Sequence, residues 1–271
     1  MTMSNSGPNF RALHHQDMAF IMPNPWDRGT AIILERLGFE ALATTSAGMA
    51  FNLGLADGAV PREAVLAHCR EIVEATTLPV SADLEQGFGD SPESAHATII
   101  AAAETGLAGC SLEDHTGDPD NPIYEKSLAV ERIGAAVEAA RGLDRDFVLT
   151  ARCENLLWGR PDLDDVIDRL QAYEVAGADV LYAPWIKSME DIARVCAALS
   201  KPVNVVIEGP GADFTLEGLS QAGVKRISIG ARLAQLAYGS LITAAREMAE
   251  KGSFAFTKNA MDHDEVEAFF K

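Results

Sequence analysis

The sequence has little positive charge. It carries 22 Lys and Arg against 40 Asp and Glu, which gives a formal net charge of -18 over 271 residues. Such a chain repels the phosphates of nucleic acid and the headgroups of anionic lipid, so either partner would need a basic patch. No apolar run approaches the ~20 residues that span a bilayer, and residues 1–10 lack the basic and apolar regions of a secretory signal. We therefore expect no nucleic-acid partner, no membrane partner and a cytoplasmic location.

Cysteines and aromatic residues are also scarce. The four cysteines, Cys69, Cys110, Cys153 and Cys196, show no Cys-x-x-Cys spacing, which argues against both a zinc ribbon and a disulfide framework. Aromatic residues make up only 7% of the chain, although 48% of all residues are hydrophobic. The sequence is therefore typical of a globular protein with a large aliphatic core and reduced, mostly buried thiols.

Eight short apolar or β-branched runs recur along the chain, and each is followed by a stretch with apolar residues three and four positions apart. The runs cover residues 20–24, 40–46, 78–83, 109–114, 147–152, 179–184, 202–207 and 226–230. Alternation of strand and helix indicates a parallel sheet, and eight such units predict a (β/α)8 TIM barrel.

We expect one domain over residues 1–271, with the barrel at about 18–250 and a C-terminal helical extension at 251–271. Helical patterns cover 231–250 and 262–271, where a minimal barrel needs only one helix. The extra helix is expected to pack against another subunit.

Acidic and polar residues follow the predicted strands at their carboxyl ends, where barrels of this kind carry their reacting groups. These residues are Thr44, Thr45, Ser46, Ala47 and Gly48 after the second strand, Asp83 and Glu85 after the third, Glu113, Asp114 and His115 after the fourth, Arg152 and Glu154 after the fifth, and Asn204 and Glu208 after the seventh.

Converging carboxylates repel one another unless protons or a hard divalent cation offset their charge. We therefore predict a Mg²⁺ site, with Asp83 as a direct ligand and with Glu85 and Glu113 holding water ligands. Asp83 and Glu85 would share a face because strand residues two apart point the same way. The alternative is that these acids only cap helices or pair with Arg152.

The order of these motifs resembles the isocitrate lyase and phosphoenolpyruvate mutase superfamily. The segments that carry the resemblance are PNPWD (23–27), TTSAG (44–48), GLADG (54–58), DLEQGFG (83–89), LED (112–114) and ARCE (151–154). The resemblance covers roughly residues 15 to 250. It implies a barrel with a helix exchanged between subunits, bound Mg²⁺ and 2-oxo-acid or related dicarboxylate substrates. It also implies that the amides of Ser46 to Gly48, with Thr45 and Asp57, hold a substrate carboxylate.

The loop after the fourth strand departs from that family. The lyases carry a Lys-Lys/Arg-Cys-Gly-His motif there, whereas this chain has HTGDPDNPIYEKS (115–127), which contains no cysteine. The thiol that acts as general acid and base in isocitrate and methylisocitrate cleavage is therefore missing. His115 and Tyr124 are our candidates for the replacement proton donor. Lys126 and Asn121 are present, but not in the order of the mutase motif.

We predict a Mg²⁺-dependent carbon–carbon lyase or decarboxylase that acts on a small 2-oxo or 2-hydroxy carboxylic acid through an enolate. Arg152 and Glu113 are the expected catalytic residues, and Arg152 and Asn204 also contact the substrate. Two alternatives stay open: a 2-oxo-acid-binding protein with little turnover, and a phosphonate or phosphoenolpyruvate mutase-type enzyme. The protein is expected to form a homo-oligomer, either a dimer or a tetramer.

Overall fold

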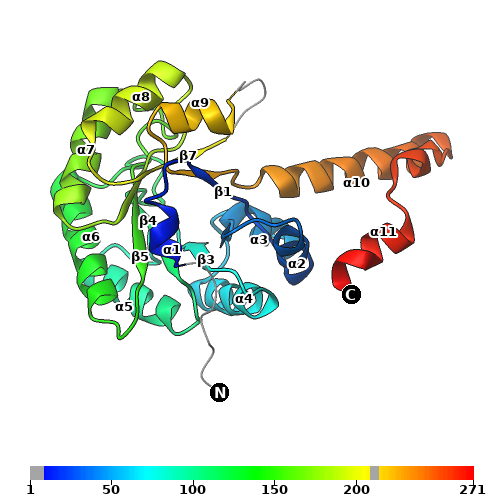
Figure 1. The fold of residues 1–271 in the computed structure, drawn as a ribbon, viewed down its shortest axis with the longest axis horizontal. Helices are drawn as coiled ribbons and strands as arrows, with labels where there is room; N and C mark the ends of the chain where they lie inside the picture. Colours follow the sequence, from blue (N-terminus) through cyan, green and yellow to red (C-terminus); the bar gives the residue numbers. More distant parts are fainter. Residues whose placement is uncertain (1–8, 208–213) are drawn as a thin grey trace.

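The computed structural model describes residues 9–207 and 214–271, and Glu208 lies outside the described residues. Eight parallel strands form one sheet in the order β1-β8-β7-β6-β5-β4-β3-β2, which curls into a nearly closed barrel with helices outside it (Figure 1). The strands are β1 (Phe20–Met22), β2 (Leu42–Ala43), β3 (Val80–Asp83), β4 (Gly109–Glu113), β5 (Val148–Arg152), β6 (Val180–Tyr182), β7 (Val203–Val206) and β8 (Arg226–Ser228). The predicted (β/α)8 barrel is confirmed.

The helices between the strands begin where capping residues predict. The side chains of Asp27, Ser91, Ser188 and Thr215 each accept a backbone N–H of the helix that follows, which satisfies a donor in its first turn. These helices are α2 (Arg28–Arg36), α3 (Ser46–Asn52), α4 (Arg62–Ala75), α5 (Pro92–Ala103), α6 (Lys126–Arg141), α7 (Leu163–Val175), α8 (Met189–Ala198) and α9 (Leu216–Gln221).

A short N-terminal helix, α1 (Phe10–Leu13), closes the bottom of the barrel. Phe10 and Leu13 are buried and pack in one cluster with Phe20 of β1. His14 follows directly and is also buried, with its ring edge-on to that of Phe20 at 5.0 Å between centroids. Helix α1 and His14 therefore fill the end of the barrel opposite to the strand carboxyl ends.

The chain ends in helical segments that begin before the extension expected at 251–271. Helix α10 (Arg232–Lys251) projects away from the barrel, and η1 (Ala255–Asn259), α11 (His263–Glu267) and η2 (Ala268–Phe270) follow it (Figure 1). Along α10 only Ala234 is buried, while Leu236 is 67% and Leu241 61% exposed. Segment η2 contacts α2 of the same chain. The expected contact of this extension with another subunit stays a prediction.

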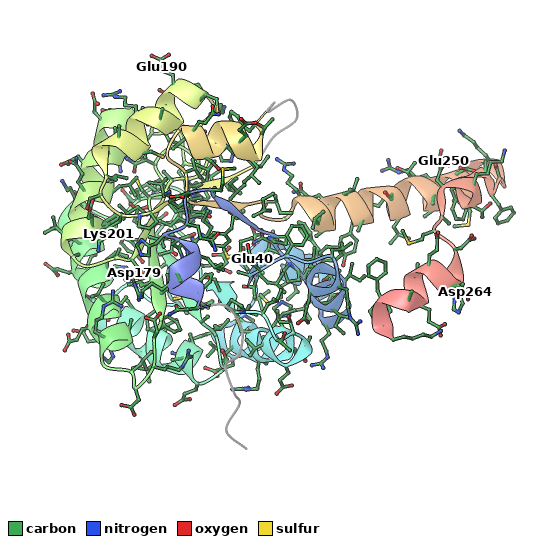
Figure 2. The ribbon with its side chains drawn as sticks, viewed as in Figure 1. Glu40, Asp179, Glu190, Lys201, Glu250 and Asp264 are labelled. Atoms are coloured by element: carbon green, nitrogen blue, oxygen red, sulfur yellow. The ribbon has the colours of Figure 1, made fainter. Side chains whose placement is uncertain are left out.

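Charged side chains cover the outer surface of the barrel. Figure 2 labels Glu190 on α8 and Glu250 on α10, both of which are exposed. In the part of the chain that the structure describes, no helix has the length and apolar character that crossing a membrane requires.

Candidate active site

A cavity of about 710 Å³ opens at the carboxyl ends of the strands. Most residues that the sequence singled out for function form its wall: Thr45, Ser46, Ala47, Asp57, Asp83, Glu85, Glu113, His115, Arg152 and Asn204. Gly48 and Tyr124 do not form part of the wall. The structure therefore brings residues from five of the predicted strands and their loops to one place, because parallel strands of a barrel all end on the same side.

Arg152 lies at the centre of the acidic residues. Its NH1 atom is 3.4 Å from Glu113 Oε2 and 3.7 Å from Asp83 Oδ2, and its Nε donates to Glu154 Oε1. Its guanidinium lies over the ring of Tyr182, 5.0 Å from the centroid. The charges of the acids outweigh its burial and raise the pKa of Arg152 well above its usual value, so this group stays cationic.

Asp83 and Glu85 both face the cavity, but our structural reason for this was wrong. Strand β3 ends at Asp83, and Glu85 lies beyond it with a φ of +50°, so strand alternation does not apply. A tight turn instead directs Glu85 inward: its N–H donates to Asp83 Oδ1 at 3.3 Å, and its carbonyl accepts the N–H of Glu113 at 3.0 Å. At Gly87, where φ is +87°, a Cβ would lie 2.7 Å from the side chain of Leu112, so only glycine fits this turn.

The carboxyl groups of this wall have raised pKa values. Burial, followed by the charges of Asp83 and Asp57, raises the pKa of Glu85 to about 7. Burial is also the largest cause that raises the pKa of Glu113, despite the opposing effect of Arg152, and that raises the pKa of Glu154. One arginine therefore does not offset these carboxyl groups, and further positive charge at this wall would stabilise their ionised forms.

The carboxylates of the cavity fit Mg²⁺ in donor type. Oxygens that bind one Mg²⁺ directly lie within about 4.2 Å of one another, twice the Mg–O distance of about 2.1 Å. The carboxylate oxygens of Asp83, Glu85 and Glu113 do not all lie within 4.8 Å of one another. Among the described residues, the group of three that meets this distance is His263, Asp264 and Glu267. This spacing fits one direct carboxylate and two that act through water.

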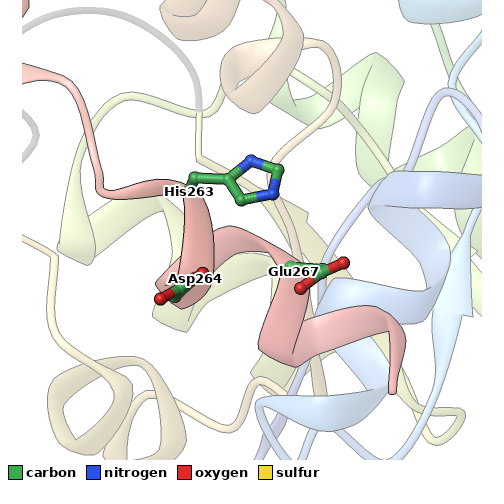
Figure 3. Close-up of side chains that lie close together, drawn as sticks. All are labelled: His263, Asp264 and Glu267. Carbon is green, nitrogen blue, oxygen red and sulfur yellow. The ribbon is translucent and has the colours of Figure 1, made fainter.

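The His263, Asp264 and Glu267 cluster is not part of this cavity. Figure 3 shows that the three side chains come from a single turn, α11, at the C-terminal end of the chain. All three are exposed, and Glu267 pairs with Lys271 four residues later. Exposed acids on one short helical turn are common without a metal, so we assign no site here.

Helix α3 brings its first turn to the cavity. Thr45 caps the helix, and its Oγ1 accepts the N–H of Gly48 at 3.3 Å. Because this N–H already donates to Thr45, it does not point to the cavity to hold a substrate carboxylate, as we had predicted. Ser46 and Ala47 remain in the cavity wall. Asp57 faces them from the loop after α3; burial in the cavity and the nearby charge of Asp83 raise its pKa, while a hydrogen bond with Ser46 opposes this.

His115 is held at the rim by an aromatic neighbour. Its ring stacks on that of Trp158 with 4.0 Å between centroids and 9° between planes, and Trp158 Nε1 donates to Glu154 Oε2 at 3.2 Å. His115 Nδ1 lies 3.7 Å from Glu113 Oε1, and its buried Nε2 has no hydrogen-bond partner in the described structure. Burial and the charge of Arg152 lower its pKa, so the ring is neutral near pH 7.

Tyr124 is not brought to the cavity, which removes our second candidate for the proton donor. Its hydroxyl donates to Asp90 Oδ1 at 2.6 Å, and the guanidinium of Arg132 lies 4.5 Å from its ring centroid. The loop folds back on itself, since Tyr124 N–H donates to the carbonyl of Asp114 at 2.9 Å. Lys126 begins α6 and pairs with Asp168, so it also lies outside the cavity wall.

Sequence reasoning missed several residues of the wall, namely Trp158, Tyr182, Trp185 and Arg226. Alternation along the sixth run could have identified Tyr182, since it lies in register between Arg152 and Asn204. Arg226 could have been noticed as a charge that opens an otherwise apolar strand. The two tryptophans lie in loops, where no periodicity predicts direction.

Comparison with known proteins gives consistent matches over the barrel. The family model described as phosphoenolpyruvate phosphomutase matches residues 10–249. 2-Methylisocitrate lyase of Escherichia coli K12 is 31% identical over 234 residues, covering 83% of this chain and 78% of that one. A solved structure of a candidate lyase/mutase from Burkholderia cenocepacia J2315 is 54% identical, covers 97% of this chain and 95% of that one, and superposes with a TM-score of 0.94. Oxaloacetate acetylhydrolase, solved with its product oxalate, is 25% identical with a TM-score of 0.85, covering 96% of this chain and 92% of that one.

Proposed function

Because the chain belongs to the isocitrate lyase and phosphoenolpyruvate mutase superfamily, we propose that it is a Mg²⁺-dependent carbon–carbon lyase of a small 2-oxo or 2-hydroxy carboxylic acid. The observation that carries this proposal is the position of Arg152, with NH1 between Asp83 and Glu113 at the wall of the cavity. A cationic donor beside a carboxylate cluster suits a reaction that develops negative charge on a substrate oxygen. The names of the relatives agree with this class, since they include a lyase and a hydrolase that releases oxalate.

Asp83 would hold Mg²⁺ directly, and Glu85 and Glu113 would orient its water ligands. When bound, the ion supplies Lewis acidity toward the carboxylate and 2-oxo oxygens of the substrate. The raised pKa of Glu85, about 7, means that its proton competes with metal binding below neutral pH.

The substrate carboxylate would lie against Ser46 and Ala47 at the start of α3, with Asp57 opposite. Arg152 would stabilise the oxygen that becomes negative during cleavage, because its Nε is fixed by Glu154 and its NH1 faces the acids of the cavity. Glu154 in turn accepts from Trp158, so the guanidinium and the His115 stack are held by one carboxylate. Asn204 lines the cavity in register with Tyr182, next to Arg152, and would contact the substrate there.

His115 is the proposed proton carrier in place of the absent thiol. Its ring lines the cavity and is neutral, so it can accept the proton that a substrate hydroxyl loses as the carbon–carbon bond breaks. The imidazolium formed in this way can return that proton to the carbanion, which becomes the released product.

A turnover assay tests the proposal. Oxaloacetate, 2-methylisocitrate, 2-alkylmalates and citrates would be incubated with enzyme and Mg²⁺, with product formation followed by chromatography. We expect cleavage of at least one acid, dependent on Mg²⁺ and lost in Asp83→Ala. Ligand binding without turnover of any acid would instead favour a 2-oxo-acid-binding protein, an alternative that the cysteine-free loop at 115–127 specifically favours.

Removing all four thiols is expected to leave any activity within about tenfold. Burial raises the pKa of Cys69 to about 12 and of Cys196 to about 11, and it also raises the pKa values of Cys110 and Cys153. None of them lines the cavity. A variant with all four replaced by Ala or Ser, first checked for folding by its melting temperature because small residues leave cavities, would be assayed beside the wild type. Loss of activity in the folded variant would contradict the mechanism.

We also propose a homo-oligomer, a dimer or a tetramer, in which the C-terminal extension packs on a neighbouring subunit. Helix α10 has one buried residue, and apolar side chains such as Leu236, Leu241 and Ile242 are exposed along it. Light scattering at micromolar concentration should return a mass of at least twice the 28.9 kDa of the chain. A monomeric mass would remove this proposal and leave the lyase proposal untouched.

A further inference from the structure

One side of the cavity is lined by large apolar side chains that are open to solvent. Leu157, Trp158 and Trp185 form part of the cavity wall and are 37%, 40% and 41% exposed. They lie in the loops after β5 and β6, which are neighbouring strands of the barrel. We call these three side chains the apolar wall. The acids Asp83 and Glu85 follow β3, so the cavity has a charged side and an apolar side.

The composition of the chain makes this wall unusual. The sequence contains only three tryptophans, and two of them line this one cavity. Single exposed apolar residues are common on protein surfaces, whereas several of them together in a concave site are typical of ligand binding. A cavity of about 710 Å³ also has the size of sites that enclose drug-sized ligands. An unsubstituted four-carbon acid held by the metal would leave the apolar wall in contact with water.

The backbone at Trp185 adds a second observation. Its φ is +68°, a left-handed conformation that is rare for a bulky residue and costs free energy. The turn places the ring of Trp185 at the cavity, while the next side chain, Ile186, is buried in the core. Glycine would adopt this conformation without strain. The chain therefore carries an exposed aromatic ring at a position where folding alone favours a residue without a side chain.

Both aromatic rings are fixed by neighbours within the protein. The Nζ of Lys187 lies 4.7 Å from the ring centroid of Trp185, and Lys187 itself is exposed and outside the cavity wall. Trp158 stacks on His115 and donates its Nε1 proton to Glu154. Rings that are already ordered lose little conformational entropy when a ligand covers them, so the apolar wall is preorganised for binding.

We propose that the apolar wall is a subsite for a bulky apolar substituent of the substrate, such as an aromatic ring or a branched alkyl group, and that Trp185 determines this preference. The carboxylate and adjacent oxygen would bind at the charged side, and the substituent would extend toward the loops after β5 and β6. This inference rests on the proposed lyase function and specifies a part of the substrate that the function leaves open.

Displacement of oxalate from the Mg²⁺-loaded protein tests the inference by calorimetry. Lactate is the unsubstituted ligand, 2-hydroxy-4-methylpentanoate and 3-phenyllactate carry apolar groups, and 2-hydroxysuccinamate is a polar isostere of the alkyl acid. At least one apolar acid should bind about tenfold or more tighter than lactate and the polar isostere, because each buried methylene raises affinity roughly fourfold.

The other outcomes separate the two proposals. Equal affinities of all four acids, or equal tightening by the apolar and polar substituents, would overturn the subsite and leave the lyase proposal in place. Failure of the four acids to displace bound oxalate would also overturn the subsite alone. If oxalate itself did not bind in the presence of Mg²⁺, the lyase proposal would fail and this inference with it.

Variants of Trp185 assign the preference to one side chain. Trp185→Gly should reduce the affinity ratio of the apolar acid to lactate to about threefold or less, with lactate unchanged and the melting temperature little changed, since glycine accepts the left-handed backbone. Leu37→Gly is the matched control, because it removes a side chain that is 58% exposed and outside the cavity wall. Its ratio should equal that of the wild type.

A folded Trp185→Gly protein that keeps the full ratio would contradict the assignment, and so would equal weakening of the apolar acid and lactate. Trp185→Asn decides the matter if Trp185→Gly does not fold, because asparagine also tolerates a left-handed backbone and is polar. A reduced ratio in this variant supports the subsite, and an unchanged ratio overturns it.

Discussion

Replacing Asp83 with alanine is expected to abolish Mg²⁺-dependent binding of oxalate, which imitates the carboxylate and adjacent oxygen of a 2-oxo acid. In the proposed site Asp83 would contact the ion directly, and its Oδ1 accepts the N–H of Glu85, so its loss would remove a ligand and loosen the turn that holds a second acid. Glu85→Gln and Glu113→Gln should weaken binding by about 10- to 100-fold, the range for groups that act through metal-bound water. Calorimetric titration of oxalate with Mg²⁺ and with a chelator measures both effects.

The control for this series is Asp90→Ala. Asp90 accepts the hydroxyl of Tyr124 outside the cavity wall, so the variant removes an acid from the same face of the barrel without touching the site. Its oxalate affinity should match that of the wild type. If oxalate binds Asp83→Ala with wild-type affinity, and equally well in chelator, the metal site proposed for the strand ends is wrong.

Arg152 is expected to have the second large effect, on rate. Removing one stabiliser of a developing oxyanion typically costs on the order of 10²-fold or more, so Arg152→Gln should lower kcat by at least that factor. Arg152→Lys should also be impaired, because an ammonium keeps the charge but cannot bind Glu154 and face Glu113 at once through separate nitrogens. Steady-state kinetics on whichever 2-oxo or 2-hydroxy acid is cleaved gives kcat and KM for each variant.

Arg11→Lys is the matched control for charge and side-chain type. Arg11 pairs with Asp146 and Asp179 at the opposite end of the barrel, so its replacement should alter the melting temperature and leave kcat unchanged. An Arg152→Lys enzyme with wild-type kcat would exclude the oxyanion role. A rise in KM without a change in kcat would instead indicate that Arg152 only holds the substrate.

The barrel could be predicted from the sequence because its signals are local. Each predicted run contains a strand of the structure, since eight apolar segments separated by capped amphipathic helices have few other ways to bury their surfaces. The candidate acids could also be placed, because a residue at a strand's carboxyl end faces the mouth of a parallel barrel. Glu85 shows the limit of this reasoning: it reaches the cavity through a left-handed turn, which depends on contacts with β4.

Residues whose role depends on distant partners could not be predicted in the same way. Tyr124 lies on the expected loop, yet its hydroxyl turns to Asp90, which is 34 residues away. His14 and Arg226 lie 212 residues apart, and neither carries a spacing that relates it to the other. Trp158 stacks on His115 only because the loops after β4 and β5 meet. Such pairs follow from closure of the barrel, which is a property of the whole chain.

The pairing of β1 with β8, and of His14 with Arg226 beneath it, has a consequence for synthesis on the ribosome. At about 5–20 residues per second, the 212 residues between these partners take roughly 10–40 s to translate. During that interval α1 and β1 have emerged without the strand that completes their hydrogen bonds, and their apolar side chains are available to other nascent segments or to a holding chaperone. The last barrel strand to be made is therefore the one that ends this exposure, and a chain arrested before β8 is expected to be a better chaperone client than the finished protein.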